Sequence, residues 1–121
     1  MSFMKRITTA VLFGAALFAM VSTPAWAAKT RVAFIPQLIG IPYFSAMEAG
    51  GKAAAEAFDV EFLYVGAPTA NAAEQVRIME NLIQQKVDAI SISVLDSASL
   101  NPVIKRAREA GIVVYTSDSD S

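Results

Sequence analysis

Two groups of side chains in this sequence carry chemistry that suits a ligand site. Gln37, Tyr43 and Phe44 belong to the stretch RVAFIPQLIGIPYF, and Asp118 and Asp120 belong to the final SDSDS. Aromatic faces pack on the apolar C–H faces of a sugar ring, and a carboxylate accepts charge-assisted hydrogen bonds from two neighbouring hydroxyls. The combination therefore favours a polyol ligand.

Each of these signals also has a plain structural explanation. Tyr43 and Phe44 at the start of a helix could belong to the core, and Asp118-Ser119-Asp120 could be a solvated turn. The two carboxylates could also serve a glycosidase or bind a hard metal, but such a metal wants more oxygen ligands than this sequence clearly provides. At the level of the individual residues, a ligand site, a purely structural role and an enzyme or metal site all stay open.

Composition argues against catalysis. The sequence has no His and no Cys, which removes the usual general base, the Ser–His and Cys–His pairs and the commonest metal ligand. No GxGxxG or Walker motif follows the first apolar run, so a nucleotide-binding enzyme is disfavoured as well. We therefore expect a protein that is not an enzyme and that uses no metal and no cofactor.

Four short apolar runs predict four β-strands, which would position these side chains. They are typical of buried parallel strands, which lack the alternation of half-exposed ones, and the first run breaks at Pro36, which cannot donate a ladder hydrogen bond. The predicted strands are Val32–Ile35, Val60–Val65, Ala89–Val94 and Ile112–Thr116.

Three amphipathic segments alternate with these strands and predict helices. The first runs over 44–58, with Pro42 acceptable in its first turn and Gly51 on its inner face for a close approach to the sheet. The second starts at Asn71, which stands three residues before Glu74 in the spacing of a capping box. The third has its inner face over 100–107 and ends before Gly111.

The predicted order is β-α-β-α-β-α-β, which favours an α/β fold with a parallel, doubly wound sheet covered on both faces. We expect the flavodoxin-like strand order 2-1-3-4, in which ligands bind outside the carboxyl ends of the strands. Three loops would converge there, at 37–44, 94–97 and 117–120. The fourth strand would be an edge although it is apolar throughout, as if a fifth strand should follow it.

The start of the chain has the features of a secretory signal peptide. Lys5-Arg6 precede an apolar run over 7–21, and Ala25-Trp26-Ala27 offers a small-residue cleavage site, so we expect residues 1–27 to be removed. An uncleaved anchor helix is the alternative, but it needs about 20 apolar residues. The remaining residues 28–121 have room for one domain and carry a net charge near −3, with eight basic and eleven acidic residues. This negative net charge argues against binding to nucleic acids, whose phosphates are contacted by basic side chains.

Several segments of the sequence resemble a known family. After the signal peptide, RVAFIPQLIGIPYFSAMEAGGKAAAE, YVGAPTANAAEQVRIMENLIQQKVDAISIS and AREAGIVVYTSDSDS are similar to the start of type 1 periplasmic sugar-binding proteins of ABC importers. The similarity lies in the branch that includes rhamnose-binding and autoinducer-2-binding receptors. It covers essentially all of residues 31–121.

The resemblance implies a non-enzymatic receptor of the periplasm that closes two α/β lobes over one sugar and delivers it to an inner-membrane ABC permease. It assigns Tyr43, Phe44 and Asp118 to the ligand site, with Gln37 and Asp120 beside them. It also implies that the full-length protein is a monomer. Residues 28–121 would then be part of the amino-terminal lobe, and the second lobe is absent from this sequence.

The ligand that the resemblance implies depends on Gln37. Autoinducer-2 receptors have Lys at this position, and Gln37 keeps a donor but loses the charge. A neutral monosaccharide, such as a rhamnose-like deoxy sugar, is therefore favoured, and autoinducer-2 is the alternative. Sugar-responsive transcription regulators share the fold, but they carry a helix-turn-helix where this sequence has its signal peptide. An exported carbohydrate-active enzyme using Asp118 and Asp120 is a third alternative.

Overall fold

The protein alternates strands and helices as expected. The computed structural model describes residues 27–120, so the expected signal peptide lies, but for its last residue, outside the described part. The elements in chain order are β1 (Arg31–Ile35), α1 (Pro42–Phe58), β2 (Glu61–Tyr64), α2 (Ala72–Gln84), β3 (Ala89–Ile92), α3 (Ser97–Glu109) and β4 (Val113–Thr116). None of the helices in this part is long and apolar enough to cross a membrane.

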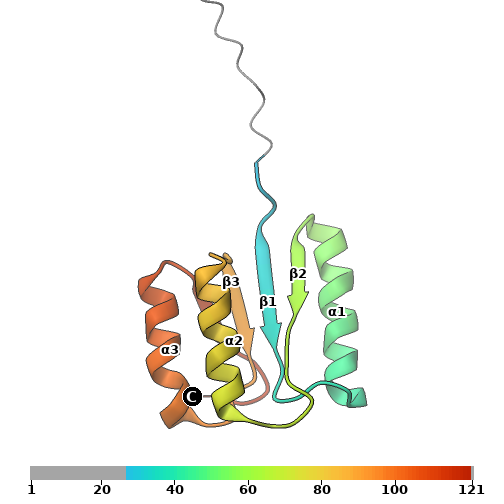
Figure 1. Cartoon of the computed structure of the whole chain (residues 1–121). Helices are drawn as coiled ribbons and strands as arrows, with labels where there is room; N and C mark the ends of the chain where they lie inside the picture. Colours follow the sequence, from blue (N-terminus) through green and yellow to red (C-terminus); the bar gives the residue numbers. More distant parts are fainter. Residues whose placement is uncertain (1–26, 121) are drawn as a thin grey trace, which may run out of the picture.

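The four strands form one parallel sheet in the order β2-β1-β3-β4, which confirms the flavodoxin-like prediction. Its strands run in the same direction, and their carboxyl ends meet at the edge where the chain also ends (Figure 1). One register line joins Phe62, Val32, Ala89 and Val113 across the sheet. Because side chains alternate between faces, these four residues lie on the same face.

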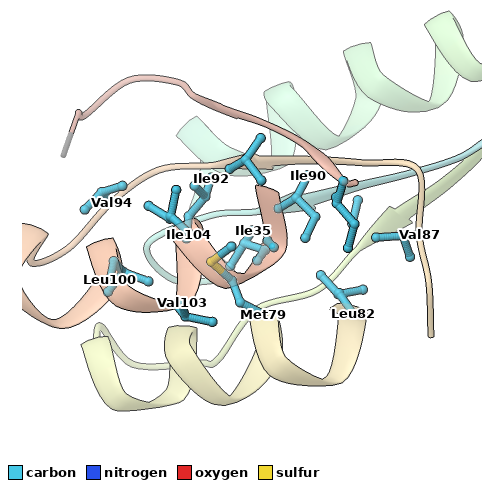
Figure 2. Close-up of a cluster of buried hydrophobic side chains, with 14 residues drawn as sticks. Ile35, Met79, Leu82, Val87, Ile90, Ile92, Val94, Leu100, Val103 and Ile104 are labelled. Atoms are coloured by element: carbon cyan, nitrogen blue, oxygen red, sulfur yellow. The ribbon is translucent and has the colours of Figure 1, made fainter. Parts of the chain in front are cut away.

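The main core lies between the other face of the sheet and helices α2 and α3. Ala33, Ile35, Ile90 and Ile92 supply the sheet side of this core, and all four are fully buried. Figure 2 shows Met79 and Leu82 of α2 and three residues of α3 meeting the strand residues. The α3 residues drawn there are Leu100, Val103 and Ile104.

Helix α1 packs on the opposite face, at the β2 side of the sheet. Gly51 permits the close approach there, because a Cβ on this residue would lie 2.3 Å from the Phe62 ring and would displace it. The close approach of α1 to the sheet at Gly51 was predicted from the sequence, whereas the exposure of Phe58 at the end of the helix was not. Only Phe44 of α1 is buried, and Phe58 is 78% exposed.

Helices lie on both faces of the sheet, as expected, but in the described residues α1 covers mainly the β2 side of its face. On the α1 face, Val113 and Tyr115 of β4 are 63% and 49% exposed. Val32, Phe58, Phe62 and Tyr115 contribute to the lining of an apolar groove of about 260 Å³ beside α1. We call this groove and the adjoining β4 side chains the open apolar face.

Local sequence signals explain where the helices begin. Asn71 caps α2 by accepting hydrogen bonds from the amides of Ala73 and Glu74 at 3.0 and 3.2 Å. The capping box is half formed, because the Glu74 carboxylate pairs with Arg77. Asp96 caps α3 through the Ser99 amide at 2.7 Å. Hydrogen bonding to the Ser99 side chain, and then to its amide, holds the pKa of the Asp96 carboxyl below its usual range.

Candidate functional site

The loops after β1, β3 and β4 come together at the carboxyl edge of the sheet, as the strand order predicts. The Gln37 side-chain amide donates to the Val94 carbonyl at 3.3 Å and to Ser119 Oγ at 3.1 Å. Ser119 Oγ in turn donates to the Val94 carbonyl at 2.7 Å. These contacts join one residue from each of the three loops, so Gln37 belongs to the cluster.

Asp118 is at the centre of the cluster and receives two side-chain hydrogen bonds. The Tyr43 hydroxyl donates to Oδ1 at 2.6 Å, and the Ser93 hydroxyl donates to Oδ2 at 3.1 Å. Tyr43 comes from the first turn of α1, and Ser93 follows β3 directly. The structure thus brings Tyr43 and Asp118 together across 75 residues of sequence.

The backbone at Asp118 has an uncommon conformation that aims its side chain. Its φ is +70°, and the Ser119 amide donates to the Ser117 carbonyl at 2.9 Å, which closes a tight γ-turn. A non-glycine residue with this backbone is strained by about 1–3 kcal/mol, and such strain clusters at functional sites.

Tyr43 and Phe44 are neighbours with different surroundings. Tyr43 is 55% exposed, whereas Phe44 is 2% exposed and packs near Phe34, with ring centroids 6.4 Å apart. The two rings of the pair meet edge to face, 5.0 Å apart at 81°. Within the described residues, Tyr43 therefore offers an accessible aromatic surface and Phe44 supports it from the core.

The hydrogen bond to Asp118 raises the pKa of the Tyr43 phenol above its ordinary value, and desolvation and the negative charge of Asp118 act in the same direction. The neutral phenol is the form that donates this bond. Its contribution to stability is therefore present below the ordinary phenol pKa and is lost as the pH rises through the raised value.

Asp120 borders the same hollow as Asp118. One of its oxygens accepts from Thr116 Oγ1 at 2.8 Å, and both residues line a shallow hollow of about 180 Å³ with Ser117, Asp118 and Ser119. The two carboxylates thus have different hydrogen-bond donors. No group of three or more His, Cys, Asp or Glu residues in the described part of the chain is arranged to hold a metal ion.

Sequence reasoning missed two residues that support the site. Ser93 is fully buried and donates to Asp118, while Gln75 is 2% exposed on the inner side of α2. The Gln75 side chain donates to the carbonyls of Pro36 and Ser93 and accepts from the Leu95 amide, at 2.8 to 3.1 Å. The available signal was a glutamine placed four residues before Met79, in the apolar stripe of α2.

The cluster can accept and donate hydrogen bonds beside an exposed aromatic ring. Asp118 supplies a fixed carboxylate and Tyr43 an aromatic surface, while Ser93 and Gln75 hold the strand ends in place. No His or Cys stands among these groups. This is the chemistry of a recognition site for hydroxyl groups.

Comparison with known proteins identifies the family. The family model for the periplasmic binding protein domain matches residues 32–121. The D-ribose/D-allose-binding protein of Pseudomonas aeruginosa is 35% identical over 94 residues, which are 75% of this chain and 30% of that protein.

Two solved structures are similar as well. A solute-binding protein of an ABC transporter from Burkholderia graminis, in complex with D-arabinose, is 41% identical, with a TM-score of 0.71 over 75% of this chain and 31% of its own. LsrB from Clostridium saccharobutylicum, in complex with AI-2, is 36% identical, with a TM-score of 0.72 over 74% and 28%.

The chain spans about 30% of the length of these relatives. Its parallel sheet and three helices match the amino-terminal lobe of type 1 periplasmic binding proteins. From the family match over residues 32–121 and these similarities, we conclude that the chain belongs to the periplasmic binding protein domain family, close to the sugar-binding proteins of ABC transporters.

Proposed function

We propose that the protein binds a small neutral sugar in the periplasm and passes it to an ABC permease of the inner membrane. The observation that carries this proposal is the Asp118 carboxylate, held between the Tyr43 and Ser93 hydroxyls at the carboxyl edge of the sheet. The sugar specificities named for the relatives support it. Export would depend on the expected signal peptide in residues 1–27.

In this proposal Asp118 accepts hydrogen bonds from sugar hydroxyls, and the exposed Tyr43 ring packs on an apolar face of the sugar. Phe44 is proposed to complete the aromatic pair from its buried position behind Tyr43. Gln37 and Asp120 would line the same edge. The described residues would form one wall of the site, and a second lobe would supply the other by closing over the ligand.

A neutral monosaccharide is favoured over a charged ligand. The Asp118 carboxylate would repel an anion, and the Gln37 amide brings no positive charge to offset it. Pentoses and hexoses, including rhamnose-like deoxy sugars, meet this requirement. The D-ribose/D-allose and D-arabinose named for two relatives belong to the same chemical class.

Autoinducer-2 is a second candidate ligand, favoured by the similarity to a solved LsrB complex. Gln37→Lys tests it, because an ammonium at this position could donate to the oxygens of the ligand. We expect this variant to bind autoinducer-2 better and neutral sugars worse. A protein that binds autoinducer-2 tightly with Gln37 in place would favour the second candidate.

The proposal can be tested on the chain itself by ligand-observed NMR. One wall of a site binds weakly, so millimolar D-ribose, D-allose, D-arabinose and L-rhamnose are added, and saturation transfer from protein to sugar is recorded. Asp118→Asn should abolish the transfer for the preferred sugar. A panel of glycosides recovered unchanged after incubation would argue against the carbohydrate-active enzyme.

Asp59→Asn is a matched control for this experiment. Asp59 also has a positive φ, +52°, but it caps the far end of α1 and pairs with Lys29. It should leave the saturation transfer unchanged. Equal transfer in Asp118→Asn and Asp59→Asn would refute the assigned site.

A further inference from the structure

The two hydroxyls that hold Asp118 reach it from different environments. Ser93 is fully buried, and its carbonyl is fixed by the Gln75 amide at 2.8 Å. Tyr43 is more than half exposed and reaches Asp118 from the first turn of α1. The Ser93 contact therefore belongs to the rigid end of β3, and the Tyr43 contact lies on the solvent side.

Tyr43 lies at the solvent-exposed start of α1, whereas Ser93 is fully buried. Ile41 occupies the N-cap position without a side-chain hydrogen bond, and Pro42 follows it. The preceding loop contains Gly40 with a φ of +88°. The Tyr43 ring touches Phe44 by an edge contact, which permits the phenol to rotate away without opening the core.

We propose that the Tyr43 hydroxyl occupies the acceptor on Asp118 Oδ1 that a ligand hydroxyl takes over, so that binding exchanges one donor for another while Ser93 keeps Oδ2. This inference rests on the proposed sugar site at Asp118. It makes Tyr43 a specificity-determining residue, because its hydroxyl sets the threshold that a ligand must exceed.

The exchange favours ligands that carry a hydroxyl donor. A ligand must bring a hydroxyl that donates to Oδ1, or the carboxylate loses a charge-assisted hydrogen bond. Sugars with a free hydroxyl at the contacted carbon meet this condition, whereas their O-methyl ethers do not. The displaced phenol, which is 55% exposed, exchanges a hydrogen bond to a charged acceptor for a weaker one to water, and this difference is the cost that the ligand must offset.

The exchange predicts an unusual direction for a conservative substitution. Tyr43→Phe removes the competing donor and keeps the aromatic ring. We expect it to bind the preferred sugar about three- to tenfold more tightly than the unchanged chain, by saturation-transfer titration. A phenol that serves to orient Asp118 would give the opposite result, so unchanged or weaker binding in Tyr43→Phe overturns the proposal.

Tyr115→Phe is the matched control. Tyr115 is also about half exposed, but it belongs to β4 and lines the apolar groove beside α1. It should bind the sugar like the unchanged chain. An equal gain in Tyr115→Phe would show that loss of any exposed phenol raises the affinity, and this too would overturn the proposal.

A second measurement separates this inference from the proposed function. The ¹³Cζ shift of labelled Tyr43, assigned by its loss in Tyr43→Phe, reports on the phenol hydrogen bond. Asp118→Asn should move it, and saturating sugar should move it the same way. Transfer to the sugar without a Tyr43 shift would refute the exchange alone. No binding of any sugar, with the Asp118-dependent shift intact, would refute the proposed function and the exchange with it.

Discussion

Asp118 combines a strained backbone with a charge that two hydroxyls hold, and its substitutions separate the two properties. Asn tolerates a positive φ better than most residues, whereas Ala does not. Asp118→Asn should therefore leave the fold nearly as stable as before, while Asp118→Ala should lower the unfolding midpoint. The midpoints can be compared by circular dichroism during urea unfolding.

Sugar binding should respond to both substitutions at Asp118. Each hydrogen bond to a charged group is worth about 1.5–3 kcal/mol, so Asp118→Ala should weaken binding at least about tenfold. Asp118→Asn should also lose affinity, because its amide presents donors where sugar hydroxyl protons point. Asp120→Ala should matter less, since the hydroxyls of Tyr43 and Ser93 donate to Asp118, whereas Asp120 accepts from Thr116. A larger loss in Asp120→Ala than in Asp118→Ala would reverse this assignment.

Among the side chains at this edge of the sheet, replacement of Gln75 should lower the stability of the protein most. Gln75→Leu keeps the volume but leaves the carbonyls of Pro36 and Ser93 and the Leu95 amide without this partner. We expect a loss of about 3 kcal/mol in the free energy of unfolding. The exposed Gln84→Leu on the same helix should change it by less than about 0.5 kcal/mol.

At the residue scale, the sequence predicted the members of the cluster better than their roles. Gln37, Tyr43 and Asp118 do meet, because strand order alone brings their loops together. The Tyr43 hydroxyl that holds the Asp118 carboxylate is 75 residues away in sequence, and no local pattern records such a contact. Ser93 and Gln75 were not predicted, because the sequence alone does not show which hydrogen-bond partner a polar residue in an apolar stripe will have.

At the scale of elements, α1 shows both what could be predicted and what could not. Apolar residues recur along it with helical spacing, so its position was predicted correctly within two residues. The exposure of Phe58 at its end was not, because periodicity indicates an apolar side without indicating what covers it. The four strands and their order were predictable because β-rich runs and right-handed crossovers leave few alternatives.

The two adjacent glycines of α1 offer a test of its packing. Gly50 is exposed, and an added Cβ would meet no atom within 4 Å, so Gly50→Ala should raise the free energy of unfolding by about 0.8–1 kcal/mol through helix propensity. Gly51→Ala gains the same propensity but must displace the Phe62 ring. We expect it to be at least about 1 kcal/mol less stable than Gly50→Ala.

Urea unfolding of the two variants gives this comparison directly. Adding Phe62→Leu to both removes the ring that the new methyl group would strike. The difference between Gly50→Ala and Gly51→Ala should then shrink. A difference that persists in the presence of Phe62→Leu would show that the backbone, and not the ring, restricts this position.

At the scale of the whole molecule, the sheet has one well-covered face and one that is partly bare. Helices α2 and α3 bury the side that carries Ile35 and Ile90, whereas the open apolar face leaves Phe58, Val113 and Tyr115 accessible. β4 is also the last strand in the sheet order of the described residues, next to β3 alone. Exposed apolar strands at a sheet edge recruit other chains.

We therefore expect residues 28–121 to self-associate in solution. Val113→Lys combined with Tyr115→Lys should reduce the association, because charged side chains on an edge strand oppose pairing with another chain. Asn81→Lys with Gln84→Lys adds two positive charges on exposed positions of α2 and serves as the control. Light scattering after size exclusion measures the mass of each variant. A monomeric unchanged chain, or equal dissociation in both double variants, would show that the open apolar face does not cause the association.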